Sequence, residues 1–341
     1  MRDRPIRLVA LLAVGAATAC VGSFGPPSTV GGANSSGTGG VNDSSSLPSD
    51  PATTASGAAA GSSGATGATS ATGVSGVSGV SGASGASGAS GGSGPSGYGV
   101  YGREAVAAFD ALGAGEKESI KTIKVLFHHH SVGENIMGFW TDDSQGGGAE
   151  ALGFTFAEAN TPADFSTLTL AHTTGGDNGD PVSKLDSFES IIVTQAFGAA
   201  VRVAVFKFCY IDFGGGSSVQ SMPQALALEA SYRATMQAVS AAHPGLRIVH
   251  VTPPLMNYWN SAGNDLRAEL GRFMRDEYGA NGFVFDLQDL ESHDATGALC
   301  SRNGVAVICD PYVGNSGHLT GLGSTRAAKG LLYTLWRAGQ Q

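Results

Sequence analysis

The sequence contains few of the residues that several common functions require. It has four cysteines in 341 residues, and no two of them form a Cys-x-x-Cys pair, so a zinc ribbon is not supported. Lysine and arginine (19) are outnumbered by aspartate and glutamate (28), and the formal net charge of −9 argues against nucleic acid as a partner. No apolar run reaches the roughly 20 residues that a membrane-spanning helix needs.

Two catalytic signatures are also absent. No Gly-x-Ser-x-Gly nucleophile elbow occurs, which disfavours a lipase-type α/β-hydrolase. The Gly214-Gly215-Gly216 run is not followed by Lys-Ser or Lys-Thr, so it does not resemble a phosphate-binding loop. We therefore predict no cofactor.

Residues 1–20 are typical of an export signal. Three arginines precede an apolar stretch at residues 8–17, and small residues follow it. The run Ala17-Thr18-Ala19 fits an ordinary signal-peptidase site, and the same residues followed by Cys20 resemble a bacterial lipobox. We favour lipidation of Cys20, which predicts attachment to the cell envelope, most simply the outer membrane. The alternative is plain secretion, and the lipid anchor is the only contact with a membrane that we predict.

Residues 21–100 consist almost entirely of Gly, Ser, Ala and Thr, with no aromatic residue between positions 25 and 97. Such a segment cannot bury enough apolar surface to offset the entropy lost on ordering, so we predict a disordered linker. Glycine recurs at every third position from Gly73 to Gly97, which is the collagen phase. Collagen-like chains are rich in proline, whereas this tract contains only Pro95, so a flexible tether is favoured over a triple helix.

Residues 101–341 form the predicted folded domain, in which β-branched, apolar runs alternate with helical patterns. This alternation predicts a three-layer α/β/α fold with a mostly parallel central sheet, like that of flavodoxin. The expected strands are 122–127, 154–156, 202–208, 247–251 and 283–285, and the expected helices are 101–113, 131–140, 181–193, 222–242, 264–278 and 319–337.

Three cysteines lie in this domain. Cys300 and Cys309 flank Asn303-Gly304, a strong hairpin signal, and an exported protein can keep a disulfide. We predict a Cys300–Cys309 bridge, with two free thiols as the alternative. Cys209 lies in an apolar run and is expected to be a buried thiol.

Folds of this class place their sites at the carboxyl ends of the parallel strands. Ser131 follows the first predicted strand and begins a helix, where backbone N–H groups could stabilise an oxyanion. The simpler interpretation is that Ser131 caps its helix in a capping box with Glu134. His318 stands in a polar loop before the last helix with Asp310 upstream, as a base and its orienting acid would.

This order of features resembles the SGNH (GDSL-like) hydrolase superfamily over about residues 120–338. In that family the nucleophilic serine follows the first strand and the histidine precedes the last helix, which implies Ser131 and His318 as the catalytic pair. The family's oxyanion donors come from two middle loops. The resemblance implies Gly176, or its neighbour Gly175, as one donor.

The second donor block of the family corresponds to residues 208–213, which contain Asp212 and no asparagine. The resemblance therefore implies a hydrogen-bonding role for Asp212 and a donor role for Asn178 in the preceding loop. The family's acid usually stands three residues before its histidine, a position held here by Asn315. Asp310 lies eight residues before His318 and could orient it only if the loop folds back.

The His128-His129-His130 run is the main rival site. His128 and His130 would share a face of a strand and could bind zinc together with Asp212 or His293. No His-Glu-x-x-His pattern is present, and histidines that pack around a nucleophilic serine explain the run equally well. We therefore predict no metal and place His130 beside the nucleophile.

Two classes of function follow. The first is an exported serine esterase that removes acyl or acetyl groups from extracellular or envelope polysaccharide, or from a small acyl ester. The second is a non-catalytic surface protein that binds glycan with the same fold. Tyr210, Phe213, Tyr258 and Trp259 could line a sugar-binding cleft, although packing is the commoner role of such residues. The sequence does not indicate an oligomeric state.

Overall fold

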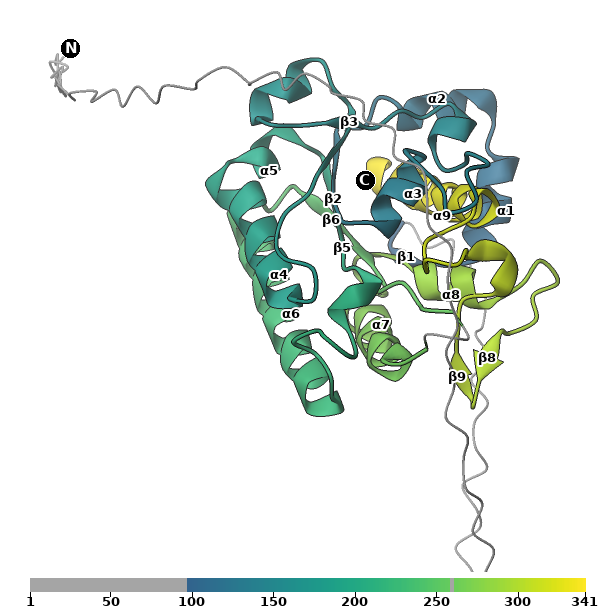
Figure 1. The fold of residues 1–341 in the computed structure, drawn as a ribbon. Coiled ribbons are helices and arrows are strands. Elements are labelled where there is room, and N and C mark those ends of the chain that lie inside the picture. Colours follow the sequence, from purple (N-terminus) through teal and green to yellow (C-terminus); the bar gives the residue numbers. More distant parts are fainter. Residues whose placement is uncertain (1–96, 258–260) are drawn as a thin grey trace, which may run out of the picture. The chain divides into compact units, whose positions relative to one another are not determined.

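The computed structural model describes residues 97–257 and 261–341, so the predicted signal peptide with Cys20, the linker to residue 96, and Tyr258 and Trp259 lie outside the described residues. The described residues contain a seven-stranded sheet in which every neighbouring pair is parallel (Figure 1). The strand order is β1-β7-β6-β5-β2-β4-β3. The bounds are β1 Gly99–Tyr101, β2 Val125–His128, β3 Ala157–Glu158, β4 Leu170–Thr173, β5 Val203–Lys207, β6 Arg247–Val251 and β7 Phe283–Phe285.

The central strands are apolar on both faces because each face is covered by helices. In β2 the side chains of Val125 and Phe127 join one hydrophobic core, and that of Leu126 joins the other. The same alternation divides Val205 from Phe206 in β5. Two separate cores, one on each face, make the fold a three-layer α/β/α sandwich, and the predicted fold class is confirmed.

Each core is closed by its own group of helices, which Figure 1 shows on either side of the sheet. No described helix is long and apolar enough to cross a membrane. The first core contains side chains of α1 Glu104–Ala111, α2 Ala114–Ile120, α3 Val132–Met137, α8 Leu287–Ser292 and α9 Gly321–Gly339. The second contains those of α4 Pro181–Glu189 with its π-helical continuation Ser190–Thr194, α5 Phe197–Ala200, α6 Met222–Ala242 and α7 Asn264–Tyr278.

Several predicted elements are wrong in place or kind. Tyr101, expected in a helix, ends β1, where it pairs with Phe285 of β7. The expected strand at 154–156 is an irregular segment in which Phe154 and Phe156 are buried, and the strand follows at Ala157–Glu158. The strand β4, which lies between β2 and the edge strand β3, was not predicted, because His172 and Thr173 interrupt its apolar pattern.

The position of β2 in the sheet creates the site. From β2 the chain crosses to β4 and β3 on one side, and from β4 it returns to β5 on the other side. The strand order therefore reverses at β2, and ligands of open α/β sheets bind in the crevice outside the carboxyl ends of the strands at such a point. Ser131 lies immediately beyond the carboxyl end of β2.

A short antiparallel hairpin leads into the last part of the domain. Its strands, β8 Ser301–Arg302 and β9 Val305–Ala306, are joined by the Asn303-Gly304 turn, as predicted. Both turn residues have positive φ, of 51° and 80°, which asparagine and glycine accept more readily than other residues. The structure contains the predicted Cys300–Cys309 disulfide, and Cys209 is a buried free thiol.

Removal of this disulfide is expected to destabilise the domain. For a loop with a sequence separation of 9, the chain-entropy model gives about 2–3 kcal/mol. The Cys300→Ser/Cys309→Ser variant should show that loss in urea unfolding without reductant. Reductant should lower the stability of the wild type and leave the variant unchanged. Equal stability of the two proteins without reductant would contradict this prediction.

Candidate active site

Ser131 joins β2 to α3 in an unusual backbone conformation. Its φ is 51° and its ψ −101°, and only a few non-glycine residues have positive φ. Its side chain makes no capping hydrogen bond to α3, and Glu134 accepts a hydrogen bond from Trp140 Nε1 at 2.7 Å, so no capping box forms. Instead, the Ser131 hydroxyl makes a short hydrogen bond with His318 Nε2. The unusual backbone conformation and the contact with the histidine thus occur at the same residue, as is common at functional sites.

His318 is presented by a tight turn before α9. Gly314 N donates to His318 O at 2.9 Å, and Gly317 has a φ of 86°, which favours glycine. The ring faces Ser131 with Nε2 and Ser316 with Nδ1, whose distance to Ser316 Oγ is 2.7 Å. Tyr210 Oη lies 3.5 Å from Nε2. The ring is therefore held on both nitrogens, with Nε2 turned to the serine.

The electrostatic surroundings favour a neutral imidazole. Burial lowers the pKa of His318, the carboxylates of Asp142 and Glu134 oppose this shift, and the Lys207 ammonium adds to it. The Trp140 ring covers the imidazole, with ring centroids 4.6 Å apart. A neutral imidazole whose Nε2 faces a hydroxyl can accept the proton of that hydroxyl.

The two residues predicted to orient His318 are not hydrogen-bonded to it in the described part of the chain. Asp310 is exposed and belongs to a 3-10 turn, Asp310–Tyr312, and Asn315 is exposed. Within the described residues no hydrogen bond joins either of them to His318. The carboxylate beside this site is Asp142, from the loop after α3. Sequence reasoning missed it because nothing in its spacing connects it with His318.

The predicted oxyanion donors lie on two loops that meet. His130 Nε2 lies 2.8 Å from Gly175 O, which ties the residue before the nucleophile to the loop after β4. The next residue, Gly176, has a φ of 77°, and a Cβ there would lie 2.6 Å from the backbone of Lys184. The backbone N–H groups of Ser131 and Gly176 donate to no other described residue. Both are free to bind an anionic oxygen.

Asn178 and Asp212 both bind Lys184, close to the same loop. Asn178 Oδ1 accepts from Lys184 Nζ at 3.0 Å, and Asp212 Oδ1 accepts from the same ammonium at 2.6 Å. Asp212 also accepts from Cys209 N at 2.7 Å and from Gly179 N at 3.1 Å. The buried carboxylate thus fixes the loops after β4 and β5 relative to each other.

Lys207 is the last residue of β5 and contacts the backbone of the residue before the nucleophile. It is buried, and its Nζ donates to His130 O at 3.2 Å and to Phe208 O at 2.8 Å. Burial lowers the pKa of Lys207 to about 8. The lysine holds the ends of β2 and β5 together at the point where Ser131 begins. Sequence reasoning missed it, because a lysine inside an apolar strand has no distinguishing motif.

The remaining histidines of the run take part in packing and local hydrogen bonds. His128 Nδ1 lies 3.1 Å from Thr173 Oγ1, and His129 Nε2 lies 3.2 Å from His172 Nδ1. His293 contacts Asp289 on α8. Across residues 97–257 and 261–341, no three His, Cys, Asp or Glu side chains are grouped so that they could hold a metal ion.

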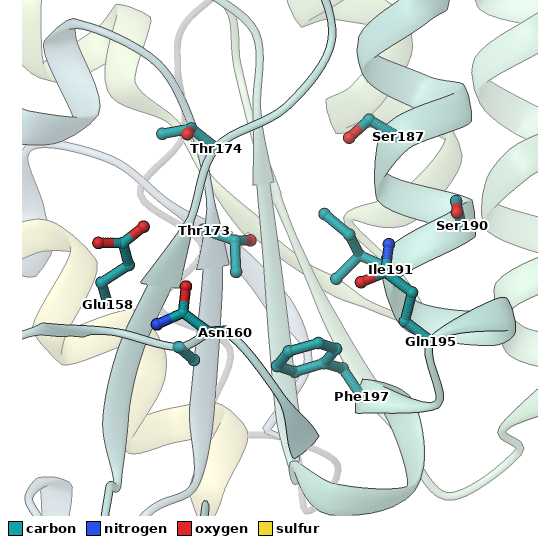
Figure 2. A pocket seen from close by; sticks show the side chains of 10 residues that line it. Glu158, Asn160, Thr173, Thr174, Ser187, Ser190, Ile191, Gln195 and Phe197 are labelled. Carbon is teal, nitrogen blue, oxygen red and sulfur yellow. The ribbon is translucent and has the colours of Figure 1, made fainter. Parts of the chain in front are cut away.

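A separate pocket of about 300 Å³ opens beside β4 (Figure 2). Thr173 and Thr174 lie on one side of it, and Ser187, Ser190 and Gln195 lie on the other. Neither Ser131 nor His318 lines this pocket. We place the candidate active site at the Ser131–His318 contact, because catalysis of this kind needs a nucleophile within hydrogen-bonding distance of a base. The size of a pocket is not evidence for such a pair.

No family model matches this chain, and no curated protein matches it. Solved structures do. A lipase/acylhydrolase from Enterococcus faecalis has 12% identity and a TM-score of 0.39, with 64% of this chain and 97% of that chain covered. A family 3 carbohydrate esterase from Clostridium thermocellum has 13% identity and a TM-score of 0.34, with 62% and 94% covered.

A carbohydrate acetylesterase from Sinorhizobium meliloti has 8% identity and a TM-score of 0.35, with 61% of this chain and 96% of that chain covered. At these identities and TM-scores the comparisons do not define the chemistry of the site. The serine after β2 and the histidine before α9 lie where the resemblance to SGNH hydrolases implied them, and they are in contact.

The buried ion pair between Asp212 and Lys184 yields a stability prediction. The Asp212→Asn variant would leave the ammonium uncompensated in the interior, and we expect a loss of about 3 kcal/mol in urea unfolding. The matched control is Glu118→Gln, which removes the exposed pair with Lys121 and should change stability by less than about 0.5 kcal/mol. Equal effects of the two variants would show that Asp212 does not hold the loops.

Proposed function

We propose that this protein is a serine esterase in which Ser131 is the nucleophile and His318 the general base. The observation that carries the proposal is the hydrogen bond between Ser131 Oγ and His318 Nε2. Ser131 Oγ attacks the ester carbonyl while its proton passes to Nε2. The resulting oxyanion binds the free N–H groups of Ser131 and Gly176.

The second half of the reaction reverses these roles. His318 gives its proton to the leaving alcohol, and the acyl group stays on Ser131 as an ester. Water then attacks this acyl-enzyme, with His318 again accepting a proton. The bond between the acyl group and Ser131 Oγ breaks, His318 returns the proton to Oγ, and the acid product leaves. No metal or redox partner is needed to balance either step.

We further propose an acylated glycan as the substrate and an extracellular or envelope location. Export follows from the signal-like residues 1–20, and a tether of roughly 75 residues would reach about 50 Å as a flexible coil. At the site, the Trp140 ring is 38% exposed, adjoins His318 and is fixed by Glu134. An exposed, immobilised aromatic ring can stack on the apolar face of a sugar with little loss of side-chain entropy.

The other predicted aromatics support this substrate less. Phe213 is buried in the second core, which agrees with packing. Tyr210 contacts the imidazole with its ring, at a centroid distance of 5.4 Å, so it belongs to the catalytic site itself. A non-catalytic glycan-binding protein on this fold remains the outcome if the following test fails.

The direct test is covalent labelling. The wild-type protein should react with a fluorophosphonate probe and hydrolyse an aryl acetate, because its hydroxyl is paired with a base. The Ser131→Ala variant should lose labelling and at least about a thousandfold in kcat/KM. Ser144→Ala, which changes an exposed serine also at positive φ, is the matched control and should react like wild type. Absence of labelling in the wild type would reject the esterase.

The rate should depend on pH through His318. The base must be neutral, so activity is lost as the pH falls through the pKa of His318. Because burial lowers that pKa from its usual 6.5, the acid limb of kcat/KM should have its midpoint below 6.5. A midpoint clearly above 6.5 would contradict this assignment of the base.

The substrate proposal has its own variant. Trp140→Ala should reduce kcat/KM for an acetylated oligosaccharide about tenfold more than for an aryl acetate, since only the former offers a sugar ring for stacking. Phe139→Ala is the matched control, because Phe139 is exposed and packs on His172, away from His318. Equal losses on both substrates would show that Trp140 only packs against His318 and does not bind the sugar.

A further inference from the structure

A general base of this kind needs an acceptor for its second nitrogen. When Nε2 of a neutral imidazole accepts the proton of Ser131, Nδ1 must carry hydrogen and donate it. No carboxylate contacts Nδ1 among the described residues, and its partner is Ser316 Oγ at 2.7 Å. A hydroxyl alone orients the ring but supplies no negative charge.

The negative charge lies on Asp142, which is hydrogen-bonded to Ser316. Ser316 Oγ donates to Asp142 Oδ1 at 2.7 Å, and Ser316 N donates to Asp142 Oδ2 at 2.9 Å. We infer that Asp142 is the acid of this site and acts on His318 through the Ser316 hydroxyl, so that Ser131, His318, Ser316 and Asp142 form a four-membered relay. The inference rests on the proposed esterase function and names two positioning residues of the same site.

All hydrogen bonds of the relay can be donated in the same direction, from Ser131 towards Asp142. Ser131 O–H donates to Nε2, Nδ1–H donates to Ser316 Oγ, and the Ser316 hydroxyl hydrogen points to Asp142. When the proton of Ser131 moves to Nε2, the imidazolium keeps its donor bond to Ser316. The Asp142 charge then stabilises it through an oriented hydroxyl dipole, and no further proton needs to move.

The fold holds Asp142 in this place. Asp142 N donates to Leu319 O at 2.9 Å, so the loop after α3 binds the chain on both sides of His318. Gly314 lies against the carboxylate of Asp142, and a Cβ at this position would be 2.6 Å from Asp142 Cγ. The absence of a side chain at Gly314 therefore lets the carboxylate approach the turn that carries His318. These contacts fix Asp142 on the turn that carries the base.

Other charged and titratable groups face the imidazole and must be included in a pH test. Glu134 on α3 is a second carboxylate, hydrogen-bonded to Trp140, and Lys207 at the end of β5 is a cation. Tyr210 contacts the ring from the loop after β5. Among the charged groups of the described residues, only Asp142 is connected to a ring nitrogen through hydrogen bonds, by way of Ser316, so its removal should have an effect that Glu134→Gln does not reproduce.

The test compares full-chain variants in aryl-ester hydrolysis. Asp142→Asn and Ser316→Ala should each lower kcat/KM about 10- to 100-fold, and the double variant should lose no more than the stronger single one, since both interrupt one relay. Asp142→Asn should also move the acid limb to lower pH, because the imidazolium loses a stabilising charge. Ser316→Thr keeps the hydroxyl and should retain activity.

The matched control is Asp143→Asn. Asp143 is exposed and accepts from Gly321 N, so it anchors the same loop to α9 without contact with the relay. We expect it to change kcat/KM less than about twofold. If Asp142→Asn behaves like Asp143→Asn while the wild type is labelled by fluorophosphonate, the relay is rejected and the esterase stands. If the wild type is not labelled, both are rejected.

A second measurement tests the relay without a variant of Asp142. Nitrogen-15 NMR of the histidines of the wild type above the pKa of His318 should show hydrogen on Nδ1 of His318. The Ser316→Ala variant should show a mixture of tautomers. Hydrogen on Nε2 in the wild type would overturn the relay, even if every variant of Asp142 failed to fold.

Discussion

The hydrogen bond between Ser131 and His318 joins the first inner strand of the sheet to the last helix of the chain. It requires β2 to end at the reversal of strand order, the backbone of Ser131 to take a positive φ, and the turn before α9 to bring the imidazole to the same edge. The first hydrophobic core fixes the positions of β2 and α9 relative to each other, since side chains of both lie in it. The candidate chemistry therefore depends on contacts between segments far apart in the chain.

Charges buried beneath this contact keep the loops in place. Lys207 binds the carbonyl before the nucleophile, and Asp212 binds the ammonium of Lys184 and the backbone of two loops. Such groups are costly to bury unless they are paired and hydrogen-bonded, and a loss of either partner leaves a charge in the interior. These buried hydrogen bonds explain how the loops that carry the proposed oxyanion donors can be held in a fixed geometry.

The sequence predicted those parts of the fold that have strong local signals. The bounds of α6, β6, α7 and β7 agree with the predicted ranges, because each has a regular apolar period and is ended by Pro or Gly or a polar turn. The short strands β1 and β4 were missed, since three or four residues carry too little pattern. Ser131 and His318 could be located because each adjoins an element boundary.

The acid could not be located in this way. Proximity in the sequence indicated Asp310 or Asn315, yet both are exposed and neither is hydrogen-bonded to His318 among the described residues. Asp142 reaches the base only because the loop after α3 packs on the turn before α9, and its link through Ser316 has no counterpart in a linear motif. A tertiary contact of this kind is visible only in the folded chain.

The most direct measurement is a crystal structure of the protein after reaction with a fluorophosphonate. The account predicts a phosphorus–oxygen bond at Ser131 Oγ and a phosphoryl oxygen about 2.7–3.1 Å from the Ser131 backbone nitrogen. It also predicts that the Nδ1 side of His318 still faces Ser316 and Asp142. A phosphonate on another residue, or one whose oxygen points away from the Ser131 amide, would contradict it.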